Sequence, residues 1–216
     1  MTHILLASAA ALLALSACQT TPYYKALEQV GIEKRDLLVD RVEDTRGSQK
    51  GAQEAFRSAL QTYRSTSNAD TARLEAAYDK FSGSYDNAKD KAGAVKSDIN
   101  TMRRVAKDMF SEWESELAKY QDASLRASSE AQLNETRRRY AALDAKLTET
   151  EAKMQPVLLA FRDRVLFLKH NLNAQAIAQM RGEQARIETD VSALIADLDA
   201  SIAEANRFIA GMRAGA

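Results

Sequence analysis

The strongest constraint on this chain is an apolar spacing that alternates steps of four and three residues over most of its length. Steps that average about 3.5 residues keep one apolar stripe on one side of a helix and make packed helices supercoil left-handedly. Strands would need alternation with a period of two, and none persists here. The clearest run is Leu74, Tyr78, Phe81, Tyr85, Ala88, Ala92, Val95, Ile99, Met102, Ala106, Met109 and Trp113.

Two further runs follow the same rule, and a weaker face precedes them. The first run is Leu133, Thr136, Tyr140, Leu143, Leu147, Thr150, Met154, Val157, Phe161, Val165 and Leu168. The second is Ile177, Met180, Gln184, Ile187, Val191, Leu194, Leu198, Ile202, Ala205, Ile209 and Met212. The weaker face is Leu38, Val42, Phe56, Leu60 and Tyr63, interrupted by Gly47 and Gly51.

Short polar stretches separate these runs at residues 65–70, 122–124 and 171–173. Small polar side chains accept hydrogen bonds from the free N–H groups of a helix start, so each stretch predicts a turn into a new helix. Because the connections are short, neighbouring helices should be antiparallel. The expected caps are Asp70 or Asn68 for the second helix and Ser124 for the third, and the asparagines at 171 and 173 are expected to turn the chain into the fourth.

The composition agrees with a helical chain, since it holds only 8 Gly and 2 Pro and is rich in straight-chain residues that favour helix. Pro156 lies inside the third run, where it predicts a kink or, alternatively, a break. Aromatic residues make up 6% of the chain, which disfavours a thick globular core. We therefore expect an all-α fold over residues 33–216, an elongated antiparallel coiled-coil bundle of three to four long helices.

The first residues predict export rather than a membrane span. The apolar run at residues 4–15 is shorter than the roughly 18 residues that cross a bilayer, but it suits the core of a signal peptide. It ends in Leu15-Ser16-Ala17-Cys18, which resembles the lipobox that signal peptidase recognises in bacterial lipoproteins. We expect residues 1–17 to be removed, Cys18 to carry a covalent lipid with acyl chains such as palmitate, and residues 18–32 to form a tether. The segment Met1-Thr2-His3 departs from this pattern because it lacks Lys and Arg.

The residue after Cys18 is Gln19 and not Asp. By resemblance to enterobacterial sorting signals, Gln19 favours the periplasmic face of the outer membrane. Tyr23 and Tyr24 follow in the tether, where they are expected either to rest at lipid headgroups or to pack on the end of the bundle. With 30 basic and 30 acidic residues the net charge is zero, which argues against nucleic acid as a partner.

The inventory of reactive side chains predicts neither an enzyme nor a metal site. His3 falls in the segment expected to be removed, so His170 is the one histidine left, and Cys18 is the only cysteine. A structural zinc site needs about four ligands at set spacings. Residues 47–51 lack the ending of a phosphate-binding P-loop, and the serine-hydrolase and zinc-protease signatures are absent from the sequence. We expect no catalytic residue and no cofactor apart from the lipid.

Two polar clusters remain as candidate binding sites. Arg137, Arg138 and Arg139 could bind the phosphate groups of lipid or lipopolysaccharide, although consecutive helical residues point in different directions and ion pairing is the simpler role. His170 could titrate near neutral pH, although a hydrogen bond at a helix end is more common. Trp113, between Glu112 and Glu114, is expected in the core.

Several segments resemble a bacterial family known as domain of unknown function 2959. They are Tyr23-Tyr24-Lys25-Ala26-Leu27-Glu28, Glu33-Lys34-Arg35-Asp36, Val39-Asp40-Arg41-Val42-Glu43-Asp44, Gln132-Leu133-Asn134-Glu135-Thr136-Arg137-Arg138-Arg139-Tyr140, and the stretch from Ala160-Phe161-Arg162-Asp163 to Asn173-Ala174. The resemblance covers about Tyr23 to Met212. It implies a coiled-coil protein of Gram-negative envelopes and carries no activity and no site residues.

The expected function is that of a non-enzymatic envelope scaffold or adaptor, held to the membrane by its lipid and presenting a helical face to a protein partner or to a second copy of itself. The alternative is a carrier or sensor of an apolar ligand or lipid within the bundle. Small residues such as Ala88, Ala92 and Ala106 would leave room for that ligand, or would simply let helices approach closely.

Overall fold

The computed structural model describes residues 34–214, so the expected signal peptide, Cys18 and the tether lie outside the described residues. Four long helices account for nearly all of this part, and consecutive helices are joined by short connections. At a rise of 1.5 Å per residue they are about 50 to 70 Å long. The elements are α2 (Lys34–Ser67), the 3-10 turn η1 (Thr71–Arg73), α3 (Leu74–Leu117), α4 (Ala123–His170) and α5 (Ala174–Ala214).

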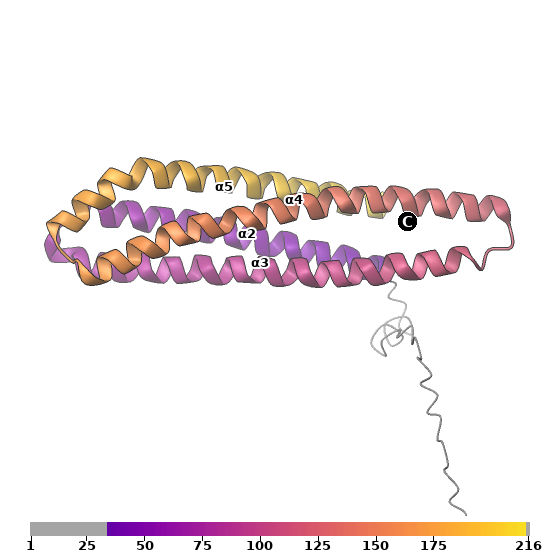
Figure 1. The fold of residues 1–216 in the computed structure, drawn as a ribbon, viewed down its shortest axis with the longest axis horizontal. Helices are drawn as coiled ribbons and strands as arrows, with labels where there is room; N and C mark the ends of the chain where they lie inside the picture. The colour runs from indigo at the N-terminus through magenta and orange to yellow at the C-terminus, as the bar shows by residue number, and fades with distance from the viewer. Residues whose placement is uncertain (1–33, 215–216) are drawn as a thin grey trace, which may run out of the picture. The chain divides into compact units, whose positions relative to one another are not determined.

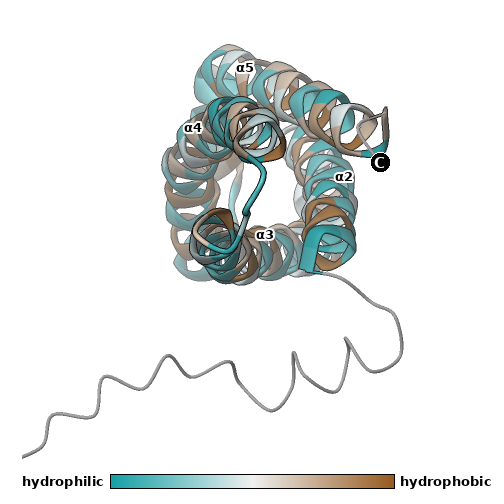
Figure 2. Ribbon diagram, turned by 90° about the vertical axis from the view of Figure 1, so that its right-hand side faces the viewer, coloured by the Kyte–Doolittle hydropathy of each residue, from teal (hydrophilic) through white to brown (hydrophobic). Residues whose placement is uncertain are grey.

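The four helices form a ring in which each packs on two neighbours (Figures 1 and 2). Helix α2 contacts α3 and α5, and α4 contacts α3 and α5, so the first and last helices close the ring. This is an antiparallel four-helix bundle with a single apolar interior. The expected all-α bundle is confirmed, with four helices rather than three.

The alternating spacing of the sequence lines this interior. Nearly all members of the three long runs are buried, including fully buried Phe81 in α3 and Phe161 in α4. The members that are only half-buried are Tyr78, Tyr85, Trp113, Thr136, Tyr140 and Gln184. Trp113, expected in the core, is therefore not a core residue.

Helix α2 has a continuous row of buried residues, here called its seam, which hydropathy alone does not reveal. The buried residues follow the same steps of four and three across the stretch that the glycines were expected to interrupt: Leu38, Val42, Thr45, Gln49, Ala52, Phe56, Ala59, Tyr63 and Thr66. Gly47 is exposed, and a Cβ on Gly51 would make only an ordinary contact of 3.7 Å with Lys91. The interruption is thus polar, because Thr45 and Gln49 occupy core positions.

The turns lie where the sequence predicted them, but two caps differ. Asp122, not Ser124, caps α4, and its carboxylate accepts hydrogen bonds from the backbone N–H groups of Ser124 at 2.7 Å and Leu125 at 3.1 Å. Asp70 precedes η1 without a capping bond from its side chain, and the Asn68 amide donates back to the Arg64 carbonyl. Asn173 accepts from the Ala176 N–H at 3.0 Å at the start of α5.

Helix α4 passes through Pro156 without interruption. The break considered from the sequence is therefore wrong. The buried residues Met154, Val157 and Leu158 lie on either side of the proline, so packing against α5 and α3 holds the helix together where one backbone hydrogen bond is missing.

Candidate functional site

One end of the bundle brings together the start of α2, the last turn of α5, and the α3–α4 hairpin. Lys34 pairs with Glu112 of α3 at 2.8 Å, and Arg35 donates to the carbonyl oxygen of Met212 at the end of α5. The Arg35 contact satisfies a carbonyl that the helix end leaves without an N–H partner. These contacts place α2 and α5 level with Glu112, short of the end of the hairpin.

A cleft of about 410 Å³ opens at this level, and all four helices contribute to its walls. We call it the Trp113 cleft, after the half-buried ring whose Nε1 donates to Ser129 Oγ at 2.8 Å. A Cβ on Gly211 would fall 2.5 Å from Arg139 Nη1, so glycine is needed at 211 for that guanidinium to lie where it does. The principal lining residues are Arg35, Trp113, Gln132, Glu135, Arg139 and Met212.

The three consecutive arginines do not act as one patch. Arg137 turns toward α3, where it pairs with Glu114 at 2.5 Å and lies 5.3 Å from the centre of the Phe110 ring. Arg138 and Arg139 both pair with Glu135 of their own helix, Arg139 at 2.7 Å. Only Arg139 lines the Trp113 cleft.

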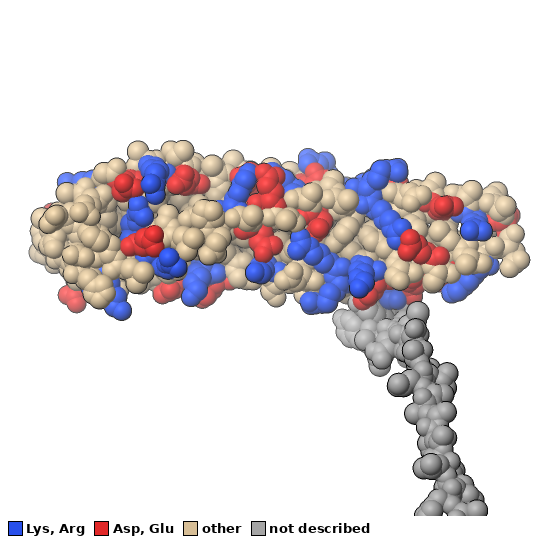
Figure 3. Space-filling model, viewed as in Figure 1, with Lys and Arg blue, Asp and Glu red and all other residues tan. Residues whose placement is uncertain are grey.

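These pairs change the acidity of their partners. Hydrogen bonds from Arg138 and Arg139 lower the pKa of Glu135 below its usual value of 4.5, and a hydrogen bond from Arg137 lowers that of Glu114. Both carboxyls are therefore ionised at neutral pH, where they balance part of the positive charge. The same mixing of signs extends over the face shown in Figure 3, where Lys and Arg lie beside Asp and Glu.

Within residues 34–214, the hairpin continues alone beyond the ends of α2 and α5. We define the α3–α4 tip as residues 111–132, because none of these residues is buried. It nevertheless carries apolar side chains: Leu125 is 57% exposed and Tyr120 is 41% exposed. Two helices alone cannot bury both of their apolar faces, so the tip is the least packed part of the described bundle.

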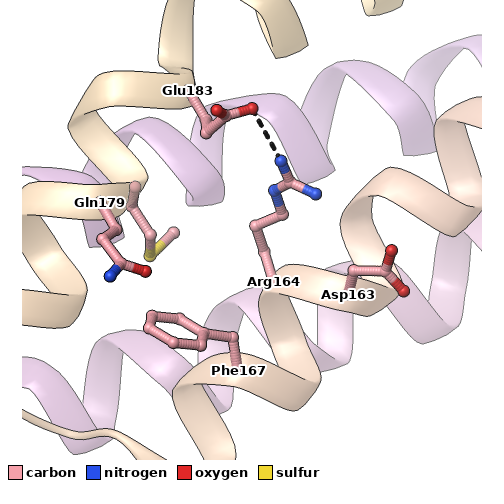
Figure 4. Close-up of a pocket in the computed structure, with 6 residues that line it drawn as sticks. Asp163, Arg164, Phe167, Gln179 and Glu183 are labelled. Carbon is pink, nitrogen blue, oxygen red and sulfur yellow. Dashed lines mark hydrogen bonds and ion pairs between the residues drawn. The ribbon is translucent and has the colours of Figure 1, made fainter.

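His170 lies far from the arginines. It is the exposed last residue of α4, and more than 30 positions along one helix separate it from Arg139, which corresponds to roughly 45 Å. One turn before it, Phe167 lines a second cleft of about 280 Å³ between α4 and α5 (Figure 4). There Arg164 pairs with Glu183 at 2.9 Å, while His170 is not part of the lining.

Sequence reasoning missed most of the residues that line the Trp113 cleft, among them Arg35, Gly211 and Met212. Met212 was assigned only to the core, and no local pattern marks Arg35 or Gly211, which come from opposite ends of the bundle sequence. Within residues 34–214, no group of three His, Cys, Asp or Glu residues could hold a metal ion, and no helix is long and apolar enough to cross a membrane.

A model of the protein family DUF2959, described as a protein of unknown function, matches residues 23–212. The match spans most of the chain, and the chain therefore belongs to this family. No curated protein and no solved structure matches it.

Proposed function

We propose that this member of the DUF2959 family is a bacterial envelope lipoprotein, anchored by a lipid on Cys18, that acts as a membrane-tethered helical scaffold. The observation that carries the proposal is the α3–α4 tip, a hairpin end where Leu125 and Tyr120 are exposed and no residue is buried by the described part of the chain. Large apolar side chains that stay exposed near one another are candidates for a site of protein association.

The geometry of the tip indicates what kind of partner fits. In the body of the bundle α2 and α5 complete the ring around α3 and α4. Toward the α3–α4 turn, neither position is filled by a described residue of α2 or α5, and the neighbouring charges are mixed, with Glu116 and Lys119 on α3 and its following turn and Arg126 on α4. A partner that supplies an amphipathic helix would bury Leu125 and Tyr120 without needing a strong charge of its own.

The lipid anchor is supported by the lipobox Leu15-Ser16-Ala17-Cys18 and by Gln19, which favours the outer membrane. Two or more acyl chains hold a protein stably on a bilayer. Metabolic labelling with a palmitate analogue should mark the wild type and not Cys18→Ala, and Gln19→Asp should move the labelled protein toward the inner-membrane fraction. Labelling that survives Cys18→Ala would contradict the anchor.

The scaffold is tested by a photocrosslinking residue placed at Leu125 in living cells. The matched control is Leu166, which lies on the same helix and is 49% exposed but belongs to the opposite half of α4. We expect a discrete protein adduct from position 125, none from position 166, and loss of the adduct in Cys18→Ala. Adducts from 125 with lipid alone, or the same proteins from both positions, would reject a partner site at the tip.

The alternative of a carrier for an apolar ligand has no specific support in the described part of the chain. The small residues expected to leave room in α3, such as Ala88 and Ala106, are themselves fully buried, as expected where helices approach closely. Native mass spectrometry of gently purified protein would detect a bound lipid and so decide in favour of the carrier.

A further inference from the structure

The Trp113 cleft has an excess of positive charge. Two of its lining residues, Arg35 and Arg139, are guanidinium cations from different helices, and Glu135 is the one carboxylate among the lining residues. Glu135 is shared, because it also pairs with Arg138 outside the cleft. One carboxylate therefore cannot neutralise the charges of Arg35, Arg139 and Arg138 together.

Both cleft arginines keep donors for a ligand. Arg35 uses Nη2 for the Met212 carbonyl, and Arg139 uses Nε for Glu135. The remaining guanidinium nitrogens of both residues make no hydrogen bond within residues 34–214. An arginine carries five N–H donors in a planar fork that matches the oxygens of phosphate groups. The contacts already made hold the side chains in place and leave part of each fork available.

The rest of the cleft is neutral and largely apolar. Trp113 has its Nε1 committed to Ser129, so its ring contributes apolar surface, as does Met212. Gln132 lines the same wall, and its side-chain amide has no partner within the described residues. A volume of about 410 Å³ lies within the range of sites that hold small ligands. A cationic rim beside an apolar wall suits a ligand that is anionic at one end only.

We propose that the Trp113 cleft is a binding site for a phosphate group, with Arg35 and Arg139 as its ligands and Trp113 and Met212 against the organic part of a phosphate ester. The chemistry fits the headgroup of an anionic phospholipid or a free phosphate. The site is distinct from the scaffold surface, since it uses neither the lipid anchor nor Leu125 and Tyr120, although Trp113 and Gln132 belong to the base of the α3–α4 tip.

Trp113 is the only tryptophan of the chain, so its fluorescence reports on this cleft alone. The full chain, kept in a maltoside detergent that contains no phosphate, is titrated with glycerophosphoglycerol, inorganic phosphate or glycerol at constant ionic strength. We expect a saturable change in Trp113 emission with a phosphate-bearing probe and none with glycerol. Calorimetry under the same conditions covers binding that leaves the emission unchanged.

Three variants test the assignment to these residues. Arg139→Gln removes a charged donor from the cleft, and the affinity should fall roughly tenfold or more. Gly211→Ala keeps every charge but forces the Arg139 guanidinium to move, so it should weaken binding as well. Arg138→Gln is the matched control, because Arg138 shares Glu135 but does not line the cleft. Circular dichroism checks that the three variants stay helical.

Tighter binding of glycerophosphoglycerol identifies a lipid headgroup as the ligand, and tighter binding of inorganic phosphate identifies a free phosphate. Both outcomes support the site. Absence of a fluorescence change and of heat with either probe overturns it. So does binding that Arg139→Gln leaves unchanged, or that Arg138→Gln weakens to the same extent.

Discussion

Gln49 of α2 donates a hydrogen bond of 2.7 Å from Nε2 to Ser201 Oγ of α5, and both side chains are fully buried. The other end of the same amide, Oε1, has no partner within residues 34–214, which is a net cost because a buried acceptor has lost its water. This pair joins the first and last helices of the ring. A polar pair in an apolar core favours one alignment of the two helices over alternatives that would leave the pair apart.

The two partners of this pair should respond unequally to substitution. Ser201→Ala leaves the whole Gln49 amide buried and unpaired, so we expect a loss of about 1 to 3 kcal/mol in the free energy of unfolding. Gln49→Met removes the unpaired Oε1 together with the donor and keeps the length of the side chain, so its stability should match or exceed that of the wild type. Urea unfolding of both variants and of the double variant measures this order. A greater loss from Gln49→Met than from Ser201→Ala would contradict it.

Tyr63 forms another of the polar links between α2 and α5. Its hydroxyl donates to the Met180 carbonyl at 2.7 Å, while its ring packs on Phe81 at 5.5 Å and Phe161 at 6.4 Å between ring centres. Burial raises the pKa of Tyr63 above its usual value of 10.0, so the group stays a neutral donor. Tyr63→Phe keeps the ring contacts and should cost about 1 kcal/mol in the free energy of unfolding.

The control for Tyr63→Phe is Tyr85→Phe in α3. Tyr85 is half-buried, and its hydroxyl makes no hydrogen bond within residues 34–214. Chemical unfolding should find this variant equal to the wild type. Equal losses in the two variants would mean that the hydroxyl of Tyr63 contributes no specific bond.

The core of α3, α4 and α5 was predictable because apolar residues occupy almost every position of the stripe. The seam of α2 could not be predicted, because Thr45 and Gln49 are polar and their burial depends on α5, which is distant in sequence. Trp113 follows the spacing of α3 and was expected in the core. It is half-buried because α2 and α5 end near its level, and the relative register of four helices is not encoded in the periodicity of any one.

The candidate site was predictable only in part, for the same reason. The arginine run at 137–139 was visible in the sequence, and the divergence of its members follows from helix geometry. That Arg139 faces a cleft depends on Gly211 and Arg35, which the fold brings together from the ends of α5 and α2. The residue that caps α4 was also not predictable, because Asp122 and Ser124 both suit a helix start and local spacing alone does not choose between them.

Glu149 should control part of the acid stability. Hydrogen bonds from Lys153 at 2.6 Å and Lys146 at 3.0 Å lower its pKa from 4.5 to about 2. A depressed carboxyl pKa adds stability above the unfolded value of 4.5, and this contribution is lost as the pH falls to about 2. Stability curves measured between these pH values should therefore be flatter for Glu149→Gln than for the wild type.

Glu151 provides the control, because it is on the same helix and has no ion pair within the described residues. Glu151→Gln therefore measures the effect of removing one negative charge from α4 without breaking an ion pair. Since Glu149 is exposed, added salt should reduce the difference between wild type and Glu149→Gln. A difference that persists undiminished in high salt would mean that the lysine pairs are not its cause.

Pro156 should cost the bundle stability that alanine would restore. Proline cannot donate a backbone hydrogen bond to the carbonyl of Ala152, and its exposed ring adds no core contact in return. Pro156→Ala should therefore raise the free energy of unfolding by up to about 3 kcal/mol, measured by urea titration.

Ala142 provides the reverse substitution, because it is an exposed position of α4 directly before the buried Leu143. Ala142→Pro should lower stability by at least a similar amount. If Pro156→Ala instead destabilises the chain, the packing of Met154 and Val157 requires the helix shape that proline imposes, and the missing bond is the smaller effect.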